Sequence, residues 1–262
     1  MIALILGTSE GKVILKELNV FTSDILVSTT TSYGGELLKE YKYKKLNTQP
    51  LEEEELKKLL LENNVKLLVD ASHPYASRIS DNCIKICKDT HISYLRYERP
   101  SVAEKYKNNE KVIFVKDYEE IIERIKSTKS LNKKETVILN TTGGNNVEKF
   151  VKADINSRVV HRILPSLKVL ENLFKLGVKV EDIVAIKGPI GLELNKGFIH
   201  QYDAKAIILK DSGKAGGTEE KIEAALEEDI YVFAIEREKK NYKQVFYTVH
   251  ELVNYIKINK VY

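Results

Sequence analysis

The sequence has few of the residues that define disulfide-rich or metal-binding proteins. Among its 262 residues there are only two cysteines, one methionine and no tryptophan. Cys83 and Cys87 stand four positions apart on a predicted helix, so we expect both to be reduced and to face one buried side. The five histidines are scattered, and no CxxC pair accompanies them. The sequence therefore predicts neither a disulfide framework nor a bound metal.

Long apolar runs and a strong charge of one sign are also missing. No apolar run approaches the ~20 residues that a membrane-spanning helix needs. Met1 leads directly into an apolar run without a basic segment or a cleavage site, so we expect no signal peptide and a cytoplasmic location. The net charge of +4 is evenly spread, which disfavours nucleic acid as a partner and leaves a polyanion open. We expect a globular monomer or small homo-oligomer.

Short apolar runs alternate with helical patterns along the whole chain. Strands are predicted at residues 2–6, 24–28, 67–69, 93–97, 112–115, 136–139, 183–186, 206–209 and 231–237, and helices include 52–61 and 118–125. Strands that are apolar throughout, such as Ile2–Leu6, are typical of parallel sheets covered on both faces. The alternation predicts an α/β fold.

The second half of the chain repeats the pattern of the first. Residues 136–144 (TVILNTTGG) correspond to 3–11 (ALILGTSEG), 206–213 to 67–73, and 231–237 to 94–99; each copy continues with a strand and a helix, VIFVKDYEEII and VFYTVHELV. We predict two tandem Rossmann-like parallel-sheet domains, 1–128 and 135–262, with a ligand cleft between them. The aperiodic segment Ser127–Lys134 is the predicted linker, about which the halves move as lobes. Generic α/β patterning is the alternative explanation.

Polar side chains crowd the end of the predicted strand at 67–69. The residues that follow it are Asp70, Ser72, His73, Tyr75, Ser77 and Arg78. Ligands of open parallel sheets bind beyond the carboxyl ends of the strands, so this stretch is a candidate site. A helix N-terminus with Ser72 as its cap and Pro74 in the first turn is the structural interpretation, and both can hold.

The loop after the first strand, Gly7-Thr8-Ser9-Glu10-Gly11, leads into a helical pattern. In such a unit the loop N–H groups and the helix N-terminus bind phosphate. We therefore predict that Gly7, Thr8, Ser9 and Glu10 bind the cofactor. The loop has two glycines where the dinucleotide fingerprint has three, and a plain turn is the alternative.

The second predicted strand ends at Ser28 without an acidic residue. NAD-specific Rossmann folds place Asp or Glu there to hold the ribose hydroxyls. The run of hydroxyl residues from Ser28 to Ser32 could instead accept a 2′-phosphate, or could form only a polar loop. NADPH is therefore the expected cofactor, with NADH as the alternative.

Two loops of the second half have a similar character. Thr141-Thr142-Gly143-Gly144 offers flexible backbone and hydroxyls to a phosphate, and Lys210–Thr218 (KDSGKAGGT) could lie along a dinucleotide with Ser212 or Thr218 capping the next helix. The predicted cofactor residues here are Thr141, Thr142, Gly143, Lys210, Asp211, Ser212 and Gly213. A glycine turn and a flexible surface loop are the alternatives. The loop from Lys187 to Gly191 is expected on the same side.

No catalytic cysteine, Ser-His-Asp order or paired-carboxylate motif is apparent in the sequence. Loops rich in glycine and hydroxyl groups, without a covalent nucleophile, suit a redox cofactor that brings its own chemistry.

Six segments together carry a family resemblance: ILGTSEGK (5–12), VDASHPYASRIS (69–80), YLRYERP (94–100), LNTTGG (139–144), KGP (187–189) and LKDSGKAGGTEEKIEAA (209–225). With them the chain resembles the precorrin-6A reductases of cobalamin biosynthesis over nearly its whole length. It departs from the family pattern at Lys12, where Arg is typical, and at 70–76, where DASHPYA replaces the common DATHPFA. It also departs at Asp211–Lys214, where the family has DSGG and the glycine pair is displaced to 216–217.

The resemblance implies an oxidoreductase that transfers a hydride from NAD(P)H to precorrin-6A, or to its cobalt form, and gives the 6B product. The substrate is a tetrapyrrole with many carboxylates, which charge-assisted hydrogen bonds would hold. The residues predicted to bind it are Ser72, Arg78, Arg96, Arg99 and Lys187, with Lys210 as a further cation. His73 and Tyr75 are predicted near the transferred hydride, with His73 as a proton donor, although water can also supply that proton.

A non-catalytic alternative is also compatible with two α/β lobes. The chain could be a cytosolic sensor of a dinucleotide or another small molecule. Turnover of the cofactor with a tetrapyrrole acceptor separates the two hypotheses.

Overall fold

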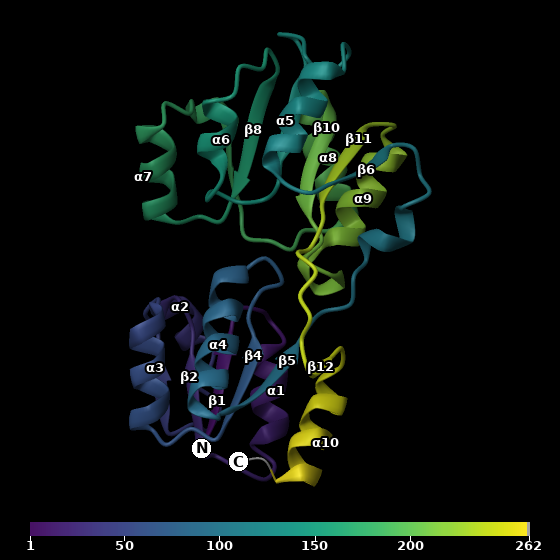
Figure 1. Ribbon diagram of the computed structural model, residues 1–262. Helices are drawn as coiled ribbons and strands as arrows, with labels where there is room; N and C mark the ends of the chain where they lie inside the picture. The colour runs from purple at the N-terminus through teal and green to yellow at the C-terminus, as the bar shows by residue number, and fades with distance from the viewer. Residues whose placement is uncertain (261–262) are drawn as a thin grey trace. The chain divides into compact units, whose positions relative to one another are not determined.

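The chain folds into two compact units, each built on its own six-stranded sheet (Figure 1). The computed structural model describes residues 1–260. The first unit contains Met1–Pro100 together with the segment from Glu238 onward, and the second contains Ser101–Arg237. The strand pairs of both sheets are parallel. The predicted α/β class with two Rossmann-like parallel sheets is therefore confirmed.

The first sheet has the strand order β12-β5-β4-β1-β2-β3. Its strands are β1 (Ile2–Leu6), β2 (Ile25–Ser28), β3 (Lys45–Asn47), β4 (Leu67–Ala71), β5 (Ser93–Tyr97) and β12 (Val245–Phe246). Its helices are α1 (Gly11–Leu18), α2 (Ser32–Glu36), α3 (Glu53–Glu62), α4 (Ser77–Thr90) and α10 (Val249–Asn259). The chain order reverses between β1 and β4, which is where doubly wound sheets bind their ligands.

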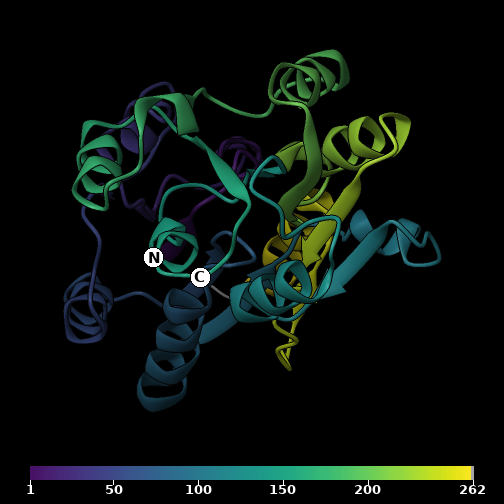
Figure 2. The ribbon, with the colours of Figure 1, turned by 90° about the horizontal axis from the view of Figure 1, so that it is seen from above.

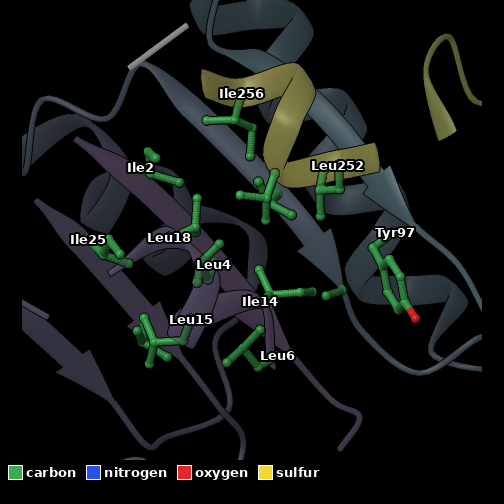
Figure 3. Packing of buried hydrophobic residues seen from close by; sticks show 14 of the residues in the cluster. Ile2, Leu4, Leu6, Ile14, Leu15, Leu18, Ile25, Tyr97, Leu252 and Ile256 are labelled. Atoms are coloured by element: carbon green, nitrogen blue, oxygen red, sulfur yellow. The ribbon is translucent and has the colours of Figure 1, made fainter. Parts of the chain in front are cut away.

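Apolar side chains cover both faces of this sheet because its central strands are apolar throughout. On one face, β1 packs against α1 and α10, through residues that include Ile2, Leu4, Ile14, Leu18, Leu252 and Ile256 (Figure 3). On the other face, α3 and α4 supply Leu56, Leu60, Cys83 and Cys87. Both cysteines are buried and free, as predicted. Burial raises the pKa of Cys87 to about 12, so its thiol stays protonated at neutral pH.

The second sheet has the equivalent order, β6-β11-β10-β7-β8-β9. Its strands are β6 (Val112–Val115), β7 (Val137–Asn140), β8 (Arg158–Ile163), β9 (Ile183–Ala185), β10 (Ala204–Lys210) and β11 (Tyr231–Ile235). Its helices are α5 (Tyr118–Ser127), α6 (Val147–Val151), α7 (Leu167–Lys175), α8 (Leu192–Tyr202) and α9 (Thr218–Glu227), with short 3-10 helices η1 (Ala103–Tyr106), η2 (Val180–Asp182) and η3 (Lys214–Gly216).

The helices of the second unit also cover both faces of their sheet. Figure 2 shows the yellow-green helices α8 and α9 on one side and the teal helix α5 on the other. Ile199 of α8 and Ile222 of α9 pack against Val160 and Leu209 of the sheet. A separate apolar cluster joins Ile163 to α6 and α7.

Each sheet takes one edge strand from the other half of the repeat predicted from sequence. β6 and α5 follow β5 along the chain, yet β6 pairs with β11 of the second sheet. β12 and α10 follow β11, yet β12 pairs with β5 of the first sheet. The repeat predicted from sequence is therefore present, but its last strand and helix are exchanged between the units.

This exchange contradicts the predicted domain boundaries, 1–128 and 135–262. The predicted linker Ser127–Lys134 lies inside the second unit, between α5 and β7. The chain passes between the units at Pro100–Ser101 and again at Arg237–Glu238. The hinge expected at Ser127–Lys134 is therefore wrong, because that segment joins helix α5 to strand β7 within one unit.

The two exchanged helices, α5 and α10, both begin with a side-chain cap. The side chain of Asp117 accepts a hydrogen bond from the backbone N–H of Glu120 at the start of α5. Thr248 does the same for Glu251 at the start of α10. Each polar cap satisfies one backbone N–H that the helix leaves without a partner.

In the described residues, no helix has both the length and the apolar character needed to cross a bilayer.

Candidate functional site

In the first unit, the loops after β1 and β4 lie against each other at the carboxyl edge of the sheet. The register pairs Leu6 with Ala71, so both strands end together. The N–H of Gly7 donates to the carbonyl of Ala71 at 3.2 Å. A Cβ added at Gly7 would lie 2.8 Å from the backbone nitrogen of His73. Only glycine therefore allows the predicted cofactor loop, Gly7–Glu10, to approach the predicted catalytic loop this closely.

Arg99 holds the cofactor loop from the end of β5. Its guanidinium donates to Glu10 from Nε at 2.7 Å and from Nη2 at 2.5 Å, and Nη2 also donates to the hydroxyl of Ser9 at 2.9 Å. Burial raises the pKa of Glu10, but the hydrogen bonds and charge of Arg99 outweigh this and leave it below its usual value. The structure thus brings predicted substrate and cofactor residues together in one ion pair.

His73 and Tyr75, the predicted catalytic residues, are half-buried neighbours on the loop after β4. Their ring centroids are 5.8 Å apart. The backbone N–H of Tyr75 donates to Nδ1 of His73 at 3.3 Å. Because Nδ1 accepts this hydrogen bond, the neutral imidazole carries its proton on Nε2.

Arg96 belongs to the interior of the first unit. Its side chain is 1% exposed and lies 2.9 Å from the carboxylate of Asp70, which is fully buried. Arg96 also donates to Ser72 at 3.0 Å, and Tyr94 donates to Asp70 at 2.9 Å. Both side chains are thus buried and engaged with other protein groups, and the expected role of Arg96 and Ser72 in binding a substrate carboxylate stays a prediction.

The helix after the β4 loop begins later than the cap interpretation predicts. α4 starts at Ser77, and the residue before it, Ala76, has no side chain that could cap. Ser72 therefore does not cap this helix. Arg78, in the first turn of α4, is exposed and pairs with Glu52, which precedes α3. It remains accessible to a ligand, unlike Arg96.

In the second unit, Thr141, Thr142 and Gly143 follow β7 around the buried side chain of Asn140. The Asn140 amide donates to Nδ1 of His161 at 3.1 Å, and its oxygen accepts from the hydroxyl of Thr142 at 2.7 Å. The hydroxyl of Thr141 donates to the carbonyl of Ile208 at 2.8 Å. Gly143 has φ = +88°, and a Cβ added there would meet no atom within 4 Å. The open part of this loop is therefore its glycine backbone.

Asp211 has a structural role in the loop after β10. Its carboxylate accepts from the hydroxyl of Ser101 at 2.6 Å and from the N–H groups of Val102 and Gly213 at 3.2 Å. Arg237 lies 3.4 Å from the same carboxylate. Asp211 thus ties together the points where the chain enters and leaves the second unit. Its carboxylate is buried, and the expected contact with a cofactor stays a prediction.

The remaining residues of this loop frame the start of α9. Gly213 and Gly217 have positive φ angles, +71° and +67°, and Gly217 is in the left-handed helical conformation. The N–H of Ser212 donates to the hydroxyl of Thr218 at 3.0 Å. The N-cap of α9 is Gly217, so neither Ser212 nor Thr218 caps this helix as expected. Burial lowers the pKa of Lys210. Lys187 is exposed after β9, in the loop predicted for it.

Sequence reasoning missed the polar residues of β8, His161 and Arg162, and also Lys221 of α9. His161 is 3% exposed, and burial lowers its pKa to about 4. Arg162 donates to the side chain of Asn195 at 2.7 Å. The segment RVVHRI (158–163) pairs its apolar and polar residues instead of alternating them, so the local signal for this strand was weak.

The carboxyl edges of both sheets fit a dinucleotide. Gly7 gives a close backbone approach next to the start of α1, and Gly143 gives open backbone after β7. Both positions follow the central strand of a doubly wound sheet, where phosphates bind. Among residues 1–260, no group of three or more His, Cys, Asp or Glu side chains could hold a metal ion.

These features define a Rossmann-like α/β protein with two doubly wound parallel sheets. The family described as "Precorrin-6x reductase CbiJ/CobK" has a sequence model that matches residues 1–257, and the chain belongs to this family.

Curated relatives agree over nearly the whole length. The chain is 39% identical over 232 residues to the cobalt-precorrin-6A reductase of Methanocaldococcus jannaschii, which covers 88% of each chain. It is 36% identical to that of Methanococcus maripaludis, over 96% of each chain, and 32% identical to that of Priestia megaterium, over 97% of each. The solved structure of "CobK precorrin-6A reductase" shares the fold, with a TM-score of 0.75 at 15% identity over 98% of this chain and 96% of that one.

Proposed function

We propose that this protein reduces cobalt-precorrin-6A to cobalt-precorrin-6B with NADPH as the donor. The observation that carries this proposal is the 39% identity to a cobalt-precorrin-6A reductase over 88% of both chains. The family match over residues 1–257 includes every loop at both carboxyl edges. The reaction consumes one NADPH and one proton, reduces one C=C bond of the macrocycle and releases NADP⁺.

The nicotinamide, when bound, supplies the hydride. The protein has to bind and orient NADPH and the macrocycle, and has to let a proton reach the macrocycle. We assign the cofactor phosphates to the backbone of Gly7–Glu10 and of Gly143, where the chain leaves a central strand. The absence of an acidic residue at the end of β2 favours NADPH over NADH. Ser28 ends that strand and Thr29 follows it, and both residues are buried.

Carboxylates of the macrocycle require cations that a ligand can reach. Arg78 and Lys187 are exposed, whereas Arg99 beside the cofactor loop is buried and pairs with Glu10. We assign Arg78 and Lys187 to the substrate and leave out the two buried arginines, Arg96 and Arg99. Removal of Arg78 should mainly raise KM for the macrocycle, since a carboxylate anchor stabilises ground and transition states alike.

His73 is the proposed proton donor. In the neutral ring its Nδ1 accepts from the N–H of Tyr75, so proton donation from Nε2 requires the imidazolium form, in which Nδ1 carries a proton and gives up that hydrogen bond. His73→Ala should lower kcat by ~10²-fold with the affinity for NADPH retained. If His73 only shapes the loop, the same variant should lose thermal stability and retain kcat.

The deciding experiment is an anaerobic turnover assay with the purified protein. Cobalt-precorrin-6A and metal-free precorrin-6A are each offered with NADPH or NADH, and nucleotide oxidation is followed together with the absorption of the macrocycle. We expect stoichiometric oxidation of NADPH with the cobalt substrate. Binding of NADPH without oxidation in the presence of either macrocycle would instead indicate a nucleotide sensor.

A further inference from the structure

The segment that returns to the first unit, residues 238–244, lies against Arg96 and is called the returning segment below. It leads into β12, and the carbonyl of Gln244 accepts from the N–H of Arg96 at 3.0 Å, so the segment ends beside β5 (Figure 1). The ring of Tyr242 lies over the Arg96 guanidinium, with 5.4 Å between the ring centroid and Cζ. The same ring stacks on Tyr94, with 6.4 Å between the centroids and 19° between the planes. The returning segment therefore contacts both the backbone and the side chain of Arg96.

Arg96 in turn contacts the start of the loop that carries His73. Its guanidinium donates to the hydroxyl of Ser72 at 3.0 Å, and the hydroxyl oxygens of Ser72 and Ser80 are 3.3 Å apart. The N–H of Ser72 donates to the carboxylate of Asp70 at 3.0 Å. Ser72 is thus held through its backbone and its side chain, one residue before His73.

Lys240 of the returning segment holds the other end of this loop. Its ammonium donates to the carbonyl of Ser77, the first residue of α4, at 3.1 Å. It also pairs with Asp81, one turn further along the helix, and its side chain is only 10% exposed. The returning segment therefore fixes residues 72–77 at both ends, through Tyr242 and Arg96 at one end and through Lys240 at the other.

The Lys240 contact acts mainly on the loop. It adds little to folding, because Asp81 is 61% exposed and ion pairs with exposed carboxylates are weak. Between the two held ends, the N–H of Ala76 donates to the carbonyl of His73 at 2.8 Å and closes a turn. A misplacement of about 1 Å can lower the rate of a reaction by ~10²-fold. A loop that carries a proton donor therefore needs support from the residues around it.

We propose that Lys240 and Tyr242 are positioning residues for the reduction, which hold residues 72–77 so that His73 keeps the orientation in which it donates a proton. The inference rests on the proposed function, and in particular on the role assigned to His73. Tyr242 acts through Arg96, and Lys240 acts through the start of α4.

The first test does not depend on turnover. Lys240→Met and Tyr242→Leu each remove one contact, and the imidazole signals of His73, assigned with His73→Gln, are followed by nuclear magnetic resonance. We expect both variants to shift or broaden these signals. Lys239→Met and Tyr247→Leu are the matched controls, because both residues are exposed neighbours of the same types. The controls should leave the His73 signals as they are in the wild type.

The second test separates positioning from ligand binding. We expect Lys240→Met and Tyr242→Leu each to lower kcat by ~10-fold, while KM for the macrocycle and the Kd of NADPH change by less than ~2-fold. Tyr242→Phe keeps a ring over Arg96, and Lys240→Arg keeps a donor for the Ser77 carbonyl, so both should restore kcat. In a His73→Ala background, Tyr242→Leu should lower kcat no further, whereas the losses of independent residues add.

The outcomes separate this inference from the proposed function. Urea unfolding shows whether each variant is folded, and Lys240→Met decides if Tyr242→Leu is not. Unchanged His73 signals or a wild-type kcat in the folded variants would overturn the proposal, as would a wild-type kcat in His73→Ala, because no proton donor would then need positioning. If the wild type oxidises no NADPH with either macrocycle while the His73 signals still move in the variants, the returning segment does fix the loop and the proposed function fails.

Discussion

The side chain of Asp70 is fully buried and has three polar neighbours. It pairs with Arg96 across β4 and β5, which the register places opposite each other, and it accepts hydrogen bonds from Ser72 and Tyr94. Asp70→Ala would leave the Arg96 guanidinium buried with the weaker partner Glu98 at 3.4 Å. We expect the free energy of unfolding to fall by about 3–5 kcal/mol, measured by urea denaturation.

Glu52→Ala serves as the control for Asp70→Ala. It breaks the exposed pair with Arg78 and the capping box at the start of α3, and should cost about 1–2 kcal/mol. If the two variants lost similar amounts, the buried network would not be the main anchor of this sheet edge. The double variant Asp70→Leu/Arg96→Met should recover most of the loss, since it leaves no unpaired charge.

His161 makes the second unit sensitive to acid. Burial lowers its pKa to about 4, whereas an unfolded histidine has a pKa near 6.5. Between these values the unfolded state binds more protons, so stability falls as the pH is lowered from about 6.5 to about 4. The loss should approach about 3 kcal/mol, from the difference of the two pKa values. His161→Gln should flatten this part of the stability–pH curve, and His250→Gln, at an exposed position, should leave it unchanged.

The sequence located the site at strand ends, but it could not distinguish its two arginines. Arg96 and Arg99 both follow the apolar part of one strand, and only the pairing of β4 with β5 shows that Arg96 faces Asp70. Asp211 likewise resembles a ligand residue in the sequence, and its partners Ser101 and Arg237 lie far from it along the chain. Burial and long-range pairing decide such roles, and neither is a local property.

At the scale of elements, most strands were predicted within two residues of their observed ends. β1 and β5 have the predicted bounds, because runs of buried apolar residues are a strong local signal. β8 and β3 were missed: β8 carries three basic residues or histidines, and β3 is a short edge strand. The exchange of β6 and β12 could not be predicted, since both segments have the same strand–cap–helix pattern and pairing is decided between distant segments.

The exchange of β6 and β12 predicts which fragments of the chain fold on their own. A fragment of residues 1–128 would carry β6 and α5 without their sheet, and would lack α10, which buries Leu252, Val253 and Ile256 against the first sheet. We expect it to bind a hydrophobic dye and to lack a cooperative urea transition. Residues 101–237, which contain all six strands of the second sheet, should fold cooperatively.

A matched pair of fragments tests the same point in the first unit. Residues 1–100 joined by a short flexible linker to 238–262 should fold, whereas residues 1–100 alone should not. A cooperative, soluble 1–128 fragment would show that the swapped strand and helix contribute little to the first unit. Near-ultraviolet circular dichroism with urea titration measures each case.

At the scale of the whole molecule, net charge and substrate charge have opposite signs. The chain carries +4 at neutral pH, and the proposed substrate is a polycarboxylate. Charges of opposite sign accelerate encounter, and salt screens this attraction as the Debye length shortens from ~30 Å at 0.01 M to ~10 Å at 0.1 M. We expect KM for the macrocycle to rise several-fold over that range while kcat stays nearly constant, because the hydride and proton transfers follow binding. Steady-state kinetics in sodium chloride measures both parameters, and Arg78→Met should reduce the slope of KM against salt. A KM that is independent of salt would mean that surface charge does not guide the substrate.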